Sequence, residues 1–155
     1  MKVVKRDGSH IVELSTDRLG TLNGAFLYEA DLTEAVMDGA IMEGAEIGLA
    51  KFVLASLRGA DLYWASCEGA DFTDADLSAV DFRGATLTGA ILRRANLANA
   101  NLGFDNVGGR TKLQGADLTD AIVTGASFDG ALYDDATKFP AEFEPLKHQM
   151  LKIDE

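Results

Sequence analysis

The chain has 155 residues, and its 47% apolar and 25% charged residues are the composition of one globular domain. A formal net charge of −11 argues against direct binding to nucleic acid or an anionic membrane, and the single cysteine, Cys67, excludes an intrachain disulfide. No apolar run approaches the length of a membrane span, and residues 1–7 lack the apolar stretch of a secretory signal. We therefore expect a single cytoplasmic domain over residues 1–155.

The N-terminal segment, residues 1–19, is predicted to form a β cap. Two short runs of β-forming residues flank Asp7 and Gly8, a pair typical of a tight hairpin turn. Residues 15–19 then lead into a repetitive region. A strand pair here would cover backbone groups that are otherwise left open at the end of a stack of repeats.

From Gly20 onward, a large apolar residue recurs at every fifth position, from Leu22 to Val107 without a miss. The residue two positions earlier is nearly always Ala, and Gly often precedes that Ala. A period of five fits neither an α-helix nor a continuous strand, whose side chains repeat about every 3.6 and 2 residues. It suits a chain that turns a corner after each short extended step. Four steps then close a square coil with the large residues and Ala inside, so Cys67 is expected to be buried and unreactive.

A one-residue insertion shifts the frame within residues 108–112, and the period then resumes from Leu113 to Tyr133. The pattern comprises 23 pentapeptides, 19 of which carry Ala two positions before the large residue. Counting by twenties places Val107 inside the coil and stacks Leu113 on Leu92. Asp105 replaces Ala just before the break. We interpret the break as a bulged corner or short loop, and the alternative is a loop that contacts a partner.

Residues 136–155 are predicted to form a C-terminal cap. Pro140 and Pro145 precede a partly apolar segment, and proline suits the first turn of a helix. We expect a short capping helix over residues 146–152.

The repeated blocks resemble the pentapeptide-repeat family, whose motif is Ala, then Asp or Asn, then Leu or Phe, then two freer positions. Blocks 30–34, 70–74, 75–79 and 95–99 carry this motif, and the resemblance covers residues 20–135. Residues 132–140 are also similar to the exit segment of many cyanobacterial members. The resemblance implies an all-β, right-handed quadrilateral β-helix, here of about six coils, from a cyanobacterium.

The net charge belongs entirely to the repeats, because residues 20–135 hold 18 acidic and 7 basic residues. Six aspartates directly precede a large inward residue: Asp31, Asp61, Asp71, Asp76, Asp81 and Asp117. Side chains of this kind support turns, so the interpretation we favour is structural. The alternative comes from the resemblance, because some family members mimic DNA and act on DNA gyrase. Against it, the rod would be short and basic residues interrupt its surface.

The candidate site is a patch of outward side chains. Tyr63 and Trp64 share one predicted coil, Arg83 lies one coil further and Phe104 two coils further. Exposed aromatic residues beside an arginine are typical of protein–protein hot spots. The alternatives are partial burial under a terminal segment and surface scatter.

No zinc-ligand spacing, phosphate-binding loop or nucleophile motif occurs in the sequence, and a filled coil offers no pocket. We therefore expect no enzyme activity, catalytic residue, cofactor or metal. The function hypothesis is a rigid scaffold, monomeric or weakly dimeric, that binds an unidentified protein partner. The alternative is an acidic DNA mimic that binds a DNA-binding enzyme such as gyrase.

Overall fold

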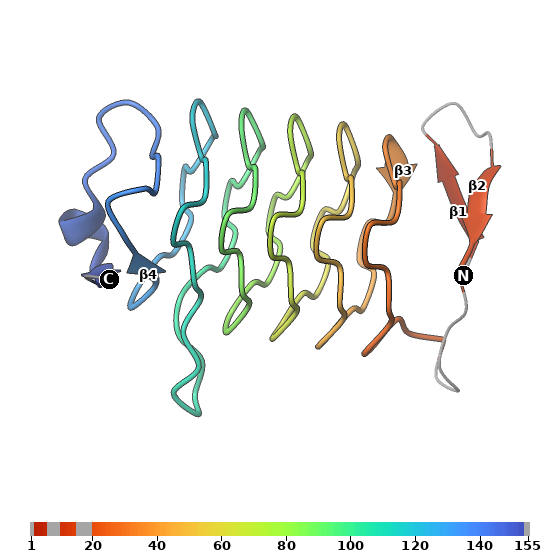
Figure 1. The fold of residues 1–155 in the computed structure, drawn as a ribbon, viewed down its shortest axis with the longest axis horizontal. Helices are drawn as coiled ribbons and strands as arrows, with labels where there is room; N and C mark the ends of the chain where they lie inside the picture. Colours follow the sequence, from red (N-terminus) through yellow and green to blue (C-terminus); the bar gives the residue numbers. More distant parts are fainter. Residues whose placement is uncertain (1, 6–9, 15–19, 154–155) are drawn as a thin grey trace.

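The computed structural model describes residues 2–5, 10–14 and 20–153, and the repeats wind into a row of stacked coils (Figure 1). Single parallel bridges join residues twenty positions apart on each of four faces. The first on each face are Phe26 with Glu46, Asp31 with Lys51, Val36 with Ser56, and Ile41 with Asp61. Four faces per coil make the four-sided all-β solenoid that the period of five predicts.

Each corner is a four-residue turn that begins at a large inward residue and ends at the next Ala. In the first corner, the Ala25 N–H donates to the Leu22 carbonyl at 2.9 Å, and Gly24 between them has a φ of 61°. A positive φ at the third position is typical of a type II turn and favours glycine, because a side chain there is strained. The pattern thus explains the Gly before Ala, and it leaves both middle residues of the turn facing outward.

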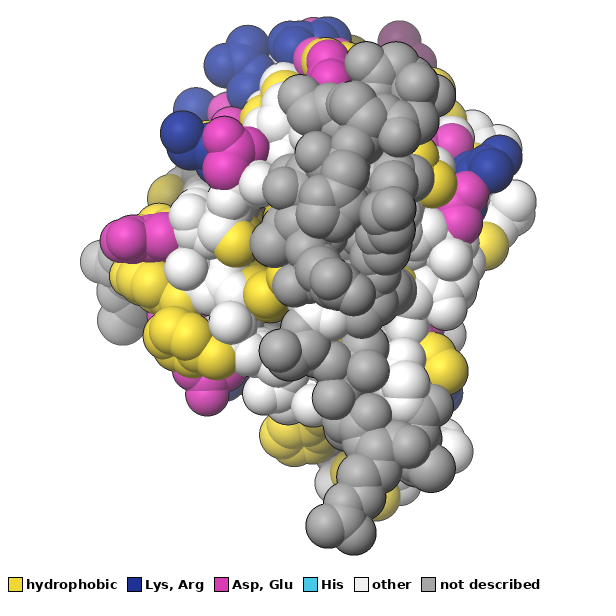
Figure 2. Space-filling model, turned by 90° about the vertical axis from the view of Figure 1, so that its right-hand side faces the viewer, with side chains coloured by type: hydrophobic (Ala, Val, Ile, Leu, Met, Phe, Trp, Pro, Cys, Tyr) yellow, Lys and Arg dark blue, Asp and Glu magenta, His cyan; other side chains and the backbone are white. Residues whose placement is uncertain are grey.

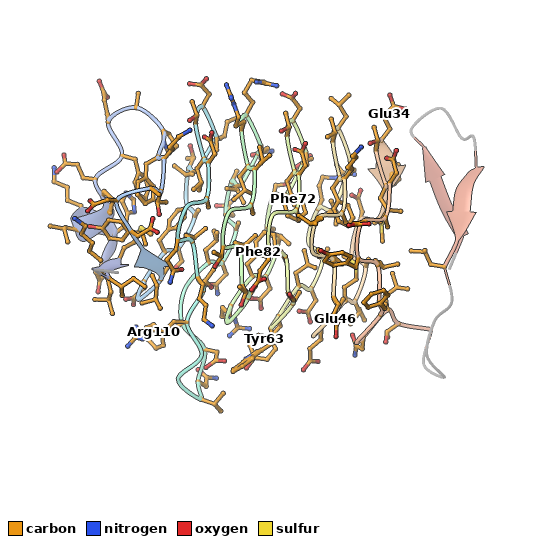
Figure 3. All side chains as sticks on the ribbon, viewed as in Figure 1. Glu34, Glu46, Tyr63, Phe72, Phe82 and Arg110 are labelled. Carbon is orange, nitrogen blue, oxygen red and sulfur yellow. The ribbon has the colours of Figure 1, made fainter. Side chains whose placement is uncertain are left out.

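The interior is filled by the large residues and the adjacent alanines, which are almost completely buried in the middle coils and partly buried at the two ends. Phe52 and Phe72 stack with centroids 5.2 Å apart, and Phe82 meets Phe72 edge-on at 6.0 Å. Figure 3 shows Phe72 and Phe82 lying within the coils. Each such side chain contributes about 1.5–3 kcal/mol of burial free energy. Cys67 is fully buried in the same core, and burial raises the pKa of its thiol.

The break in the period adds six residues, not the one that the sequence predicts. Thr86 pairs with Lys112, which is 26 positions on, whereas earlier bridges span 20. An insertion of six shifts a five-residue frame just as an insertion of one does, because a whole repeat leaves the pattern unchanged. The extra residues form the loop that extends farthest from the coils in Figure 1, and a bridge between Phe104 and Arg110 closes its stem.

The longer insertion corrects two further sequence assignments. Val107 lies on the loop and is 79% exposed, although the period places it inside. Leu113 follows Leu87 on its face, because the Leu87 N–H donates to the Lys112 carbonyl at 2.8 Å, so it does not stack on Leu92 as predicted. Each later inward residue shifts by one face in the same way.

At the N-terminal end, strand β1 (Lys2–Lys5) pairs antiparallel with β2 (His10–Glu13) and with β3 (Ala35–Val36) of the first coils. The predicted Asp7-Gly8 turn and the lead-in over residues 15–19 lie outside the described residues. Figure 2 faces this end and shows hydrophobic side chains at its flank.

The predicted C-terminal helix is a single 3-10 turn, η1 (Pro145–His148), which ends at Gln149 with a φ of 55°. Strand β5 (Leu151–Lys152) follows and pairs in parallel with β4 (Leu132–Tyr133), so the helix prediction is wrong for these residues. The strand prevails because the last coil offers free carbonyls, as in the Leu151 N–H donating to Ala131 at 2.9 Å. None of the described helices has the length and apolar character to span a membrane.

Pairing between coils continues beyond the predicted end of the repeats at residue 135. Asp117 forms a bridge with Lys138, and the Leu118 N–H donates to the Lys138 carbonyl at 2.7 Å. The segment after the last pentapeptide therefore completes one more side of the solenoid before the chain turns to η1.

Candidate functional site

Tyr63 and Trp64 are the two middle residues of one corner turn, so both side chains point outward. Their rings meet edge-on at 6.3 Å, and the guanidinium carbon of Arg83 lies 5.6 Å from the centroid of the Tyr63 ring. The structure therefore brings together three of the four predicted site residues. Arg83 also holds Asp81 through its Nη2, at 2.6 Å, so its charge is already paired and less available to a partner than predicted.

Asp105 connects this aromatic pair to the loop. Its carboxylate accepts hydrogen bonds from Trp64 Nε1 at 2.6 Å and from the Tyr63 hydroxyl at 3.1 Å. The same carboxylate accepts from the backbone N–H groups of Val107, at 2.8 Å, and Gly109, at 2.7 Å. Asp105 is only 2% exposed. Burial opposes its charge, but the four hydrogen bonds outweigh burial and leave the pKa of Asp105 below its usual value.

Two glycines leave the space that the indole of Trp64 occupies beside Asp105. A Cβ added to Gly109 would lie 2.6 Å from Trp64 Cζ2, and one added to Gly84 would lie 2.9 Å from Nε1. Trp64 itself has a φ of 56°, a strained value for a residue with a side chain. It is nevertheless 50% exposed, so a large aromatic face is held rigidly at the surface.

Phe104, the fourth predicted residue, lies two coils beyond Trp64 and faces outward, where the sequence places it. Its N–H donates to the Asp129 carbonyl at 2.9 Å, and its ring lies over Gly130 in the following coil. Among the described rings, none pairs with that of Phe104. Phe104 is 48% exposed and joins the patch through its neighbour Asp105, not through contact with Trp64.

Thr111 closes the loop back into the coil. It is fully buried in a position that Ala occupies elsewhere, and its Oγ1 lies 2.8 Å from the Phe82 carbonyl and 2.9 Å from the Gly103 carbonyl. The hydroxyl can therefore donate a hydrogen bond to one of these two carbonyls, which lie where the coil is interrupted.

Beside the loop lies an open hollow of about 340 Å³, bordered by Trp64, Ser66, Thr86, Arg110 and Lys112. Ser66, Thr86 and Lys112 are successive rungs of one bridge ladder. The hollow lies over Ser66 and Thr86, whose side chains are short. Figure 3 places Tyr63 and Arg110 along the same lower edge of the molecule.

The sequence does not predict the contacts of Asp105 or the position of Arg110 and Lys112 beside the hollow. One signal was present, because a carboxylate at an inward position normally occupied by Ala requires hydrogen-bond donors from elsewhere. The identity of those donors depends on the length of the loop, which the period does not reveal.

The six aspartates that precede inward residues perform turn chemistry, as the favoured interpretation states. Each accepts a hydrogen bond from the backbone N–H two residues on, such as Asp71 from Thr73 at 2.9 Å. Among the described residues, no group of three or more His, Cys, Asp or Glu side chains could hold a metal ion.

Comparisons with known proteins find the same repeats. A family model described as pentapeptide repeats matches in eight copies, over residues 21–47, 55–94 and 75–104. Among solved structures, alr5209, a pentapeptide repeat protein from Nostoc, is 25% identical over 87% of this chain and 88% of its own, with a TM-score of 0.49. Rfr23 from the cyanobacterium Cyanothece is 30% identical over 64% of each chain, with a TM-score of 0.32. A search of curated proteins gives no match.

Proposed function

Because this chain belongs to the pentapeptide-repeat family, whose members fold as right-handed quadrilateral β-helices, we propose that it is a non-catalytic scaffold that binds another protein. The contact surface would be the loop site, which we define as residues 104–110 with Trp64 and Lys112. The protein would act in the cytoplasm of a bacterium, as a monomer or weak homodimer.

The observation that carries this proposal is a set of exposed apolar side chains on the loop and on the corner turn that Asp105 joins to it. Trp64, Phe104 and Val107 are 50%, 48% and 79% exposed, and the carboxylate of Asp105 holds both the loop backbone and the Trp64 indole. Aromatic residues dominate many protein interfaces, and side chains already held in place lose little entropy on binding. These properties support a preformed protein-contact site.

The contacts of the acidic residues favour this function over DNA mimicry. The six turn aspartates bond their own backbone, and Asp38, Asp74 and Asp81 are paired with arginines. A gyrase supercoiling assay separates the two functions. We expect no effect of the purified chain, whereas inhibition or protection of gyrase would support the mimic.

The loop site is tested by affinity capture from an extract of the host cell. Val107→Glu places a charge on the loop tip without touching the core, and we expect it to abolish capture of the partner. Ile122→Glu is the matched control, because Ile122 is 52% exposed on a different face. Identical capture by the wild type and Val107→Glu would contradict the proposed site, as would the absence of any specific partner.

A further inference from the structure

The hollow in the loop site is bordered by two cations, although the chain as a whole carries a net charge of −11. We propose that this hollow binds an acidic segment of the partner protein in an extended conformation. This inference rests on the proposed function and adds the chemistry of the partner. Three observations support it: the two cations make no ion pair among the described residues, the hollow has the shape for an extended peptide, and acidic residues flank it.

The cations at the hollow remain available for a ligand. Arg58, Arg83 and Arg94 are held by carboxylates at 2.6 Å, but within the described part of the chain Arg110 and Lys112 make no ion pair. Arg110 Nη1 donates to the Gly130 carbonyl at 3.0 Å, which fixes the guanidinium at the rim. Its other N–H groups can donate to an incoming carboxylate, and such charge-assisted hydrogen bonds are the strong ones.

The shape of the hollow suits an extended peptide. Ser66 and Thr86 line it and offer hydroxyl groups, while Lys112 lies on the next rung of the same ladder. Trp64 and Leu132 supply apolar surface at its border. Side chains of an extended peptide alternate between two faces, so an acidic and an apolar side chain can reach different walls of the hollow.

The surrounding charge favours a short acidic segment over nucleic acid. Glu46 occupies the rung before Ser66, and Asp129 lies beside the stem of the loop. Exposed charges act over about 8 Å at physiological ionic strength. A nucleic acid would extend its phosphates over these acidic flanks, whereas a peptide can confine its carboxylates to the hollow.

The single tryptophan, Trp64, makes the test direct, because intrinsic fluorescence reports on the wall of the hollow. The probe is a short capped peptide of alternating Glu and Leu, and its control has Gln in place of Glu. We expect saturable quenching or a spectral shift with the Glu peptide that weakens with added salt. Lys112→Glu should weaken binding by roughly tenfold or more, since it replaces an attractive charge with a repulsive one.

Lys51→Glu is the matched control, because Lys51 is an exposed lysine on another face, and we expect binding within about twofold of the wild type. Equal binding of the Gln peptide, or an unchanged affinity in Lys112→Glu, would overturn the proposal. So would a dimer, seen by sedimentation, that Lys112→Glu dissociates, because the hollow would then bind a second copy of this chain. If Val107→Glu abolishes capture of the partner but the Glu peptide does not bind, the acidic ligand is refuted and the protein-contact site stands.

Discussion

Replacing Thr111 with Val removes one hydroxyl from a fully buried position and keeps the shape of the side chain. In regular coils, the outward carbonyl of a corner accepts from the backbone of the preceding coil, as Arg83 accepts from Trp64 N–H at 3.1 Å. The Gly103 carbonyl has no such backbone donor among the described residues, and Thr111 Oγ1 lies 2.9 Å from it. Losing this donor leaves a buried acceptor unsatisfied, which costs about 1–3 kcal/mol of unfolding free energy.

Urea unfolding followed by circular dichroism measures this cost. For a small protein, unfolding free energy falls by about 1–3 kcal/mol per molar urea, so the midpoint should drop by roughly 1 M. Thr111→Ser should retain most of the stability because it keeps the hydroxyl. Thr124→Val, at an exposed position, should change stability by less than about 0.5 kcal/mol. A Thr111→Val variant as stable as the wild type would show that the hydroxyl does not stabilise the interrupted coil.

Three further predictions concern the core and the charges. Phe72→Ala should lower the unfolding free energy by about 3–5 kcal/mol in the same assay, because Phe72 packs against two other rings, and a loss below 1 kcal/mol would contradict a filled core. Cys67 should resist thiol reagents in the native protein and react in urea, since burial raises the pKa of its thiol, and rapid native labelling would disprove its burial. The pKa values of Asp38, Asp81 and Asp117 are lowered, because hydrogen bonds and cations outweigh the opposing effect of burial. Their contribution to stability is therefore complete above pH of about 4 and is lost as the pH falls through the lowered values, so thermal melts should show a decreasing midpoint below pH 4 and not at pH 5 to 7.

The regular part of this fold could be predicted because every pentapeptide obeys the same two constraints. The large residue and Ala must fit a dry interior, and the residue before Ala must accept a positive φ or carry the strain. Leu62 and Phe72 therefore reveal their burial from the period alone, and the Asp before each inward residue reveals its turn. These relations are local in sequence and need no knowledge of distant contacts.

The interrupted coil could not be predicted in the same way. Insertions of one and of six residues shift a period of five by the same amount, so the sequence cannot tell them apart. The period therefore places Val107 inward, although it lies at the tip of a loop. The link between Asp105 and Trp64 spans 41 residues and depends on where the loop folds back. The strand at Leu151 likewise depends on the carbonyls that the last coil leaves open, which a helical pattern in residues 146–152 does not show.

Asp105 joins the loop and the aromatic corner into one preorganised surface. The indole N–H of Trp64 tests this link directly, because a chain with one tryptophan gives one indole signal in a ¹H–¹⁵N correlation spectrum. We predict a shifted signal that exchanges slowly with solvent in the wild type, and that moves toward the free-indole position and exchanges rapidly in Asp105→Ala. A wild-type signal already at the free-indole position, or one unaffected by Asp105→Ala, would contradict the claim.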